Sequence, residues 1–239
     1  MGLRADCPSC DLPHAAPGPT CAMTIWAILS DIHGRGDRLA RALADAGARG
    51  AGRILCLGDL GGTHVLDQLN HAGAERVFGN WEASGLRGMA QPYRGQVARW
   101  PAQYRSDSFW AAHASPVWPD GLAIGDVVDY LQARGLHWTA LFPSLSRSRE
   151  ARSAALAGLA EAGVSVFFHG HTHIQEAWVE APGSSPQRLS GSGLILSDDG
   201  SRVLIGVGSI GDASDGPEAR YVLYDAARRE VTWSGHSLS

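Results

Sequence analysis

The sequence predicts an α/β fold with more than one sheet, and two observations lead to this class. In the first part of the chain, short continuous apolar runs alternate with segments of helical periodicity, as in parallel strands joined by helices. Toward the C-terminus the pattern changes to short strands between Gly, Ser and Asp turns, which predicts a second sheet in meander order. The 239 residues, 44% of them hydrophobic, suffice for one domain with a large core.

The first three elements are a strand, a helix and a strand. Residues 24–29 form a continuous apolar run that ends at Asp31, as expected for a strand covered on both faces. Residues 37–47 carry apolar side chains at helical spacing, and Asp37 is the expected N-cap. The second strand covers residues 53–57 and ends at a Gly-Asp pair.

A helix over residues 63–72 and a third strand over 75–78 complete a β-α-β-α-β unit. Polar residues follow each strand, with Asp59 after the second and Asn80 after the third. Open α/β sheets form their sites at the carboxyl ends of the strands, because the loops there converge on one crevice.

The middle of the chain is less regular. Residues 83–105 have a mixed pattern and are left unassigned, and a fourth strand over 108–112 ends at His113. Residues 117–150 are rich in Trp, Pro, Arg and Ser, with one short helix expected at 126–133. This composition predicts a cap-like insertion over the edge that holds the site.

A helix over 153–162 leads into a fifth strand over 164–168. Residues 181–193 are expected to form a loose hairpin loop. The remaining short strands are expected at residues 177–179, 194–196, 202–207, 221–224 and 231–233.

Charge and composition narrow the functional class. The net charge of −4 disfavours stable binding of long nucleic acids, which usually requires a basic surface. No apolar run approaches the roughly 20 residues of a membrane span, and the N-terminus lacks the pattern of a signal peptide. We therefore expect a cytoplasmic protein with reduced thiols and no membrane contact; nothing in the sequence specifies an oligomeric state.

Residues 1–22 are expected to be a leader outside the domain, which then covers residues 23–239. The leader has two interpretations: a zinc site, or a flexible Pro- and Ala-rich segment without a role in the fold. The zinc interpretation would use Cys7, Cys10, His14 and Cys21.

Two acidic turns are candidate metal sites. Asp31 and His33 lie two residues apart at a strand end, so both side chains can reach one cation; the alternative is a helix cap and a surface His. Asp59 follows Gly58, and its carboxylate can bridge two ions; the alternative is an ordinary Gly-Asp turn. Asn80 offers a neutral amide oxygen, unless it only occupies a turn position.

His-containing strand ends complete the candidate set. A lone His such as His113 is often a satisfied, partly buried residue rather than a ligand. His171 and His173 are more specific, because two imidazoles at alternate positions beside a core need partners, which a metal pair supplies. His169 points to the other side of the pleat and is not counted, while His137 in the insertion is a possible substrate contact.

Taken in order, these stretches resemble the calcineurin-like metallophosphoesterase superfamily over residues 24 to about 225. The stretch Gly208-Ser209-Ile210-Gly211 resembles the small bacterial phosphodiesterase branch of this superfamily. The other matching stretches are Ser30-Asp31-Ile32-His33-Gly34, Leu57-Gly58-Asp59-Leu60, Gly79-Asn80-Trp81-Glu82, Ala112-His113-Ala114-Ser115-Pro116 and Gly170-His171-Thr172-His173.

The resemblance implies two packed mixed sheets flanked by helices and a pair of divalent cations, with Mn²⁺ expected and Fe, Zn, Ni or Co possible. It implies that Asp31, His33, Asp59 and His173 hold one ion, and that Asp59, Asn80, His113 and His171 hold the other. Asp59, Asn80 and His113 are the expected catalytic residues. The implied reaction is in-line attack on phosphorus by a hydroxide that bridges the two ions.

This sequence departs from the superfamily pattern at Trp81, where a His often helps the leaving group depart. An indole cannot act as a general acid, which favours a small phosphodiester, such as a cyclic nucleotide, over a monoester with a poor leaving group. Protein phosphatases and diadenosine tetraphosphate hydrolases carry an Asp-Arg-Gly continuation after the bridging Asp, whereas this chain has Leu60-Gly61-Gly62-Thr63, so those branches are not expected. Arg35 is a candidate phosphate contact or a solvated cation, and Glu82 supports the loops or is solvated.

The expected function is therefore hydrolysis of a small phosphodiester or nucleotide substrate. Three alternatives remain open: a phosphomonoesterase or nucleotidase, a nuclease, and a non-catalytic scaffold that binds a protein partner. The complete set of ligand residues disfavours the scaffold.

Overall fold

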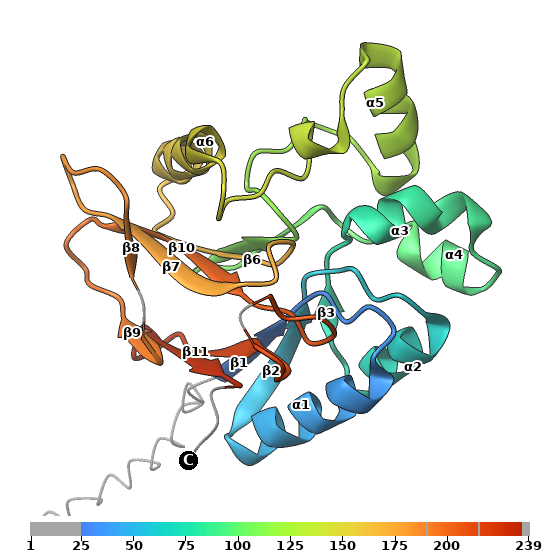
Figure 1. Ribbon diagram of the computed structural model, residues 1–239, viewed down its shortest axis with the longest axis horizontal. Coiled ribbons are helices and arrows are strands. Elements are labelled where there is room, and N and C mark those ends of the chain that lie inside the picture. Colours follow the sequence, from blue (N-terminus) through green and yellow to red (C-terminus); the bar gives the residue numbers. More distant parts are fainter. Residues whose placement is uncertain (1–24, 190, 215, 236–239) are drawn as a thin grey trace, which may run out of the picture.

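The computed structural model describes residues 25–189, 191–214 and 216–235. Two six-stranded mixed sheets lie face to face with helices on their outer sides, which confirms the predicted α/β class (Figure 1). The Cys-containing leader falls outside the described residues, so the zinc interpretation stays a prediction. None of the helices in the described ranges has the length and apolar character needed to cross a bilayer.

The first sheet has the strand order β3-β2-β1-β11-β12-β9. Its parallel half is the predicted unit, β1 (Ile25–Leu29), β2 (Ala51–Cys56) and β3 (Glu75–Arg76), connected by α1 (Gly36–Ala48) and α2 (Thr63–His71). Its antiparallel half consists of β11 (Tyr221–Asp225), β12 (Glu230–Ser234) and β9 (Gly193–Ile195).

The second sheet has the strand order β4-β5-β6-β10-β7-β8. It contains β4 (Gln103–Arg105), β5 (Trp110–Ala112), β6 (Val166–His169), β7 (Gln175–Glu180), β8 (Gln187–Leu189) and β10 (Arg202–Val207). The helix α6 (Arg149–Glu161) covers its outer face, opposite α1 and α2 (Figure 1).

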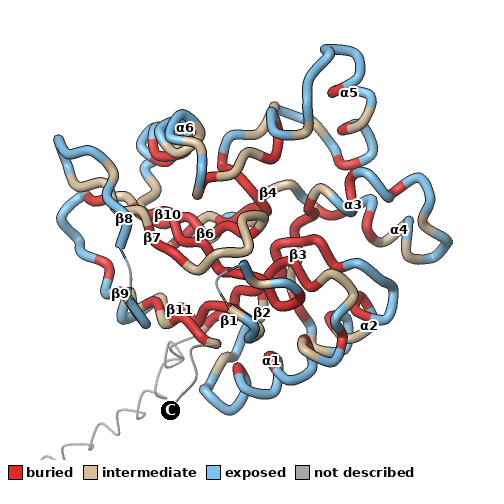
Figure 2. Tube along the Cα trace, in the orientation of Figure 1, coloured by how far each residue is buried: buried red, intermediate tan, exposed pale blue. Residues whose placement is uncertain are grey.

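Alternating side chains explain how the layers pack. On β1, Trp26 and Ile28 point into the core between the sheets, whereas Ala27 and Leu29 face the helical side. Phe109 lies in the inter-sheet core, with its ring centroid 5.3 Å from that of Phe168. Figure 2 shows buried residues along the strands and the loops at their ends, while the outer helical faces are exposed. Because the strands are covered on both faces, their sequences are continuous apolar runs.

Several sequence expectations need correction. The C-terminal strands do not form a separate meander, because β10 pairs in parallel with β6 while β11 pairs with β1. The expected loop at 181–193 contains β8, which forms a hairpin with β7. The sheet that each C-terminal strand joins depends on which strand edges are available in the tertiary structure, and local periodicity carries no information about this.

The N-cap of α1 is also different from the prediction. Arg35 occupies that position, because its carbonyl already accepts the Leu39 N–H at 3.0 Å. Asp37 lies in the first turn and pairs with Arg41 at 3.0 Å. Its carboxylate still suits the positive end of the helix dipole.

The unassigned stretch 83–105 consists mainly of short helices, α3 (Asn80–Gly85), η1 (Leu86–Gly88) and α4 (Tyr93–Val97), before β4. The insertion at 117–150 contains η2 (Ile124–Asp126), α5 (Val127–Arg134) and η3 (Trp138–Ala140). Its Phe142 ring lies 5.9 Å from His113, so the insertion reaches the candidate site. The role of these residues as a cap stays a prediction.

Candidate metal centre

The structure brings all seven predicted ligands to one edge of the two sheets. Asp31 and His33 follow β1, Asp59 follows β2, and His113 follows β5 in the opposite sheet. Asn80 begins α3, while His171 and His173 follow β6. The carboxyl ends of parallel strands from both sheets therefore converge, as the sequence pattern predicted.

Two groups of side chains have the geometry of cation sites. The ligand atoms of Asp31, His33 and His173 all lie within 4.8 Å of one another, and so do those of Asp31, Asp59 and His113. Asp31 Oδ1 is buried without a well-formed hydrogen bond, 3.2 Å from Nε2 of His173 and 3.7 Å from Nε2 of His33. A buried carboxylate oxygen flanked by imidazole nitrogens is a good fit for a divalent cation.

Asn80 and His171 adjoin the second group. Asn80 Oδ1 lies 3.0 Å from His113 Nε2, and that nitrogen lies 3.5 Å from Asp59 Oδ2. The His171 ring centroid is 5.1 Å from that of His113. The cluster thus contains both predicted ligand sets, although their roles as ligands stay a prediction.

The backbone of the cluster is unusual. Asp31, His33, Asp59, His171 and His173 have φ angles between 48° and 61°, in the left-handed region. Only one other non-glycine residue in the described ranges has a positive φ. Such conformations cost roughly 1–3 kcal/mol each and concentrate at functional sites, where the surrounding structure holds them. Five of the seven predicted ligands are therefore positioned against their local preference.

Close backbone approach explains two glycines of the matching stretches. A Cβ on Gly79 would lie 2.2 Å from Asp59 Oδ1, and one on Gly170 would lie 2.6 Å from Asp31 Oδ2. Neither distance is sterically possible, so the loops require residues without a side chain.

Hydrogen bonds to the chain orient the imidazoles. Nδ1 of His113 lies 2.9 Å from the Leu57 carbonyl, and Nδ1 of His173 lies 2.7 Å from the Asp212 carbonyl. When each Nδ1–H donates to its carbonyl, the Nε2 of the neutral imidazole carries no proton and faces the other ligand candidates of the cluster. This is the arrangement in which histidine binds a metal.

The carboxyl groups of the cluster have shifted pKa values. Burial raises the pKa of Asp31, but His113, His173 and His33 outweigh it and hold the pKa well below its usual range. Burial raises the pKa of Asp59 to about 6, helped by the negative charges of Asp31 and Glu82 and opposed by His113.

The imidazoles are shifted in opposite directions. Burial and the neighbouring His113 lower the pKa of His171 to about 4. Burial also acts against His173, but its hydrogen bond and charge interaction with Asp31 raise its pKa to about 9. The same competition raises the pKa of His113, because Asp59, Asp31 and Glu82 outweigh its burial.

Glu82 has a larger role than the sequence alone indicated. Its buried carboxylate accepts backbone N–H groups from Asp59 at 2.8 Å, Leu60 at 2.9 Å and Gly79 at 2.8 Å. It therefore joins the loop after β2 to the start of α3, and with them Asp59 and Asn80. Its position three residues after Gly79 is the spacing of a capping box, which is the signal that could have predicted part of this role.

Ser209 supports the cluster from the far end of the chain. Its buried hydroxyl donates to the Asp31 carbonyl at 2.7 Å and accepts the Asp212 N–H at 2.8 Å. The sequence marked this residue only through the resemblance of residues 208–211. Arg35, in contrast, lies 3.6 Å from Asp37 at the start of α1, and its role in substrate binding stays a prediction.

The fold and the ligand cluster together define a metallophosphoesterase class, and the comparison with protein families agrees. A model described as the calcineurin-like phosphoesterase superfamily domain matches residues 23–229, so the chain belongs to this superfamily. No curated protein matches the chain.

The comparison with solved structures found matches of low sequence identity, of which the first named here has a similar fold. A metallophosphoesterase from Sphaerobacter thermophilus has 18% identity and a TM-score of 0.67, with 90% of this chain and 89% of that chain covered. The phosphoesterase YfcE from E. coli has 16% identity and a TM-score of 0.43, over 84% and 88% of the two chains. An archaeal phosphodiesterase has 14% identity and a TM-score of 0.47, over 88% and 99%.

Proposed function

We propose that the protein is a phosphodiesterase that uses two divalent cations to hydrolyse a small phosphodiester. The observation that carries this proposal is the convergence of two carboxylates, one amide and four imidazoles, five of them held in left-handed backbone conformations. Asp31, His33, Asp59 and His173 would hold one ion, and Asp59, Asn80, His113 and His171 would hold the other. Bound as a pair, such ions provide a water-derived nucleophile at neutral pH and neutralise the phosphoryl oxygens.

The chain's own residues provide orientation. The backbone N–H of Trp81 donates to Asp59 Oδ1 at 2.9 Å, and Glu82 holds the backbone on both sides of this contact. His113 is held by the Leu57 carbonyl so that its Nε2 faces the cluster. These contacts fix the carboxylate and the imidazole before any ligand arrives, which lowers the entropy lost on binding.

Trp81 supports a diester over a monoester as the substrate. Its indole N–H is too weak an acid to protonate a leaving group at neutral pH, so a poor leaving group would depart without proton transfer from this position. Manganese is the expected metal, and the cytoplasm is the proposed compartment. The ligand atoms are oxygen and imidazole nitrogen, which suit manganese, iron and zinc alike.

Hydrolysis of bis-p-nitrophenyl phosphate and of 2′,3′- and 3′,5′-cyclic nucleotides with added Mn²⁺ tests the proposal, with p-nitrophenyl phosphate as the monoester comparison. We expect diester turnover that Asp59→Asn reduces at least 100-fold, while Asp107→Asn, at an exposed turn, leaves it unchanged. Absence of turnover with every metal would refute the proposal. Faster hydrolysis of the monoester would favour the phosphomonoesterase alternative.

A further inference from the structure

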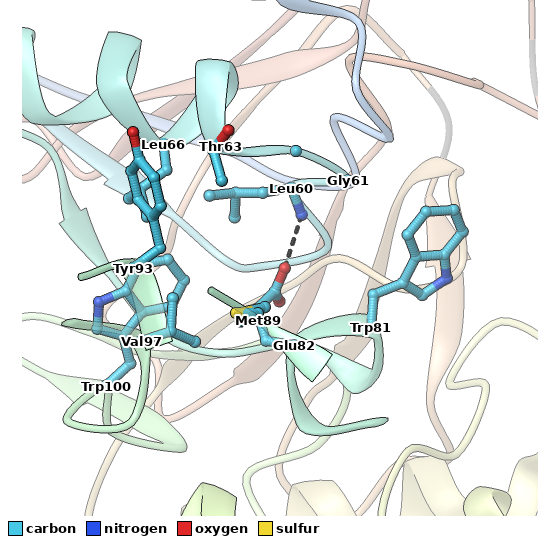
Figure 3. A pocket seen from close by; sticks show the side chains of 11 residues that line it. Leu60, Gly61, Thr63, Leu66, Trp81, Glu82, Met89, Tyr93, Val97 and Trp100 are labelled. Atoms are coloured by element: carbon cyan, nitrogen blue, oxygen red, sulfur yellow. Dashed lines mark hydrogen bonds between the residues drawn. The ribbon is translucent and has the colours of Figure 1, made fainter. Parts of the chain in front are cut away.

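An apolar pocket lies directly beside the candidate metal centre. It has a volume of 280 Å³ and lies between the loop after β2 and the helices α3 and α4. Figure 3 shows Trp81 at one end, Tyr93 and Trp100 at the other, and Leu60 and Glu82 between them. We call this cavity the arm pocket.

Two residues that line the arm pocket are sequence neighbours of residues in the ligand cluster. Leu60 directly follows Asp59, and Trp81 directly follows Asn80. The Trp81 ring meets His33 edge to face, with 4.4 Å between the ring centroids. Trp81 is nevertheless 50% exposed, so its indole borders both the cluster and the pocket and leaves ring surface free for a ligand.

The chemistry of the lining selects an uncharged occupant. Among the described residues that line the pocket there is no Lys, Arg or His, so the lining offers no cationic side chain to a phosphate. Glu82 already accepts three backbone N–H groups, and the Tyr93 hydroxyl already donates to Asp67 at 3.1 Å. The remaining polar side-chain groups are the Thr63 hydroxyl and the indole N–H groups of Trp81 and Trp100, so recognition in the pocket depends mainly on apolar contact.

The size of the pocket limits the occupant further. Pockets that enclose a whole drug-sized ligand usually measure roughly 300–1,000 Å³, so 280 Å³ suits a single ring system. Flat aromatic rings stack well on exposed aromatic side chains, and one such stack corresponds to roughly 5- to 150-fold in affinity.

We propose that the arm pocket binds an uncharged aromatic arm of the phosphate-ester substrate, with Trp81 as the stacking surface, while the phosphate lies at the metal centre. This inference rests on the proposed function and names the substrate class. Trp81 would thus contribute to substrate selectivity, at a position where a His would protonate the leaving group. An ester whose arms are both small and alkyl would leave the pocket unused.

Binding of alkylphosphonates to the Mn²⁺-loaded full chain tests the inference without turnover, because their C–P bond is not hydrolysed by phosphoesterase chemistry. Calorimetry compares methylphosphonate with benzylphosphonate and 2-phenylethylphosphonate. We expect the best aromatic compound to bind roughly tenfold or more tightly than methylphosphonate, the factor expected from one stacked ring.

Two variants test whether the tighter binding of the aromatic compounds comes from the arm pocket. Trp81→Ala is expected to reduce the aromatic preference to below about threefold, and Met89→Trp, which fills the pocket beside Glu82 (Figure 3), is expected to do the same. Ile195→Ala, at a residue that is 75% exposed on β9, is the control and should retain the full preference. Unfolding midpoints of all variants separate loss of the pocket from loss of the fold.

The outcomes distinguish the two proposals. Equal binding of methyl and aromatic phosphonates by the wild type, with turnover of bis-p-nitrophenyl phosphate intact, overturns the arm pocket and leaves the proposed function standing. Retention of the preference in both pocket variants also overturns the pocket. Absence of phosphonate binding together with absence of turnover overturns the proposed function, and with it this inference.

Discussion

Replacing Glu82 with glutamine tests whether one buried carboxylate holds two ligand loops together. The side chain is 2% exposed, and its two oxygens accept three backbone N–H groups. Glutamine has the same shape but only one oxygen. In the orientation that loses the fewest hydrogen bonds, this oxygen keeps the contacts with the Asp59 and Gly79 N–H groups, and the new amide NH₂ group faces the Leu60 N–H.

The magnitude follows from these three contacts. The Leu60 N–H becomes a buried donor without an acceptor, which costs about 1–3 kcal/mol. The two remaining bonds change from charge-assisted to neutral and lose about 1 kcal/mol each. Relief of the buried charge offsets part of this loss. We expect Glu82→Gln to lower the free energy of unfolding by about 2–4 kcal/mol.

Urea unfolding of the metal-free protein measures this value, with an unchanged m-value as the sign that the same transition is observed. Calorimetry should also show Mn²⁺ affinity reduced roughly 10- to 100-fold, as for other residues that support metal ligands. The control is Glu161→Gln, at an exposed residue of α6, which should change stability by less than about 0.5 kcal/mol. A loss below about 1 kcal/mol with normal Mn²⁺ affinity would refute the positioning role of Glu82.

Three further predictions concern the same cluster. In the metal-free protein, the raised pKa of His173 beside Asp31 stabilises the fold below pH 6.5, and this contribution should disappear as the pH rises through about 9. Urea midpoints of the wild type should therefore fall over that window relative to His173→Gln; parallel profiles would contradict this. Gly79→Ala should reduce diester turnover at least roughly 100-fold, because its Cβ would displace the Asp59 carboxylate, and near-normal kcat would contradict the steric argument. Ser209→Ala should lower the free energy of unfolding by about 1–3 kcal/mol, since two hydrogen bonds of the hydroxyl are lost, one to the buried Asp31 carbonyl and one from the partly buried Asp212 N–H; urea unfolding measures it, and an unchanged midpoint would exclude this role.

The local hydrophobic pattern of the sequence was sufficient to predict the strands whose ends carry the candidate ligands. Periodicity located the strands that end before Asp31, Asp59 and His113, and the geometry of α/β sheets placed their carboxyl ends at one edge. The ligand cluster was therefore predictable before any coordinate was known. The same pattern overestimated β3, which is limited to Glu75–Arg76.

Long-range packing decided how the C-terminal strands pair. The choice of β1 as the partner of β11 and of β6 as the partner of β10 depends on which edge is open in three dimensions, and sequence periodicity carries no information about that edge.

The sequence by itself determined the residue types at the strand ends, because element type is encoded over a few neighbouring residues. Only the tertiary structure placed five ligands in left-handed conformations, joined two loops through Glu82, and opened an apolar pocket beside Trp81. Each of these features depends on contacts between segments far apart in the chain, and such contacts exist only once the two sheets have packed.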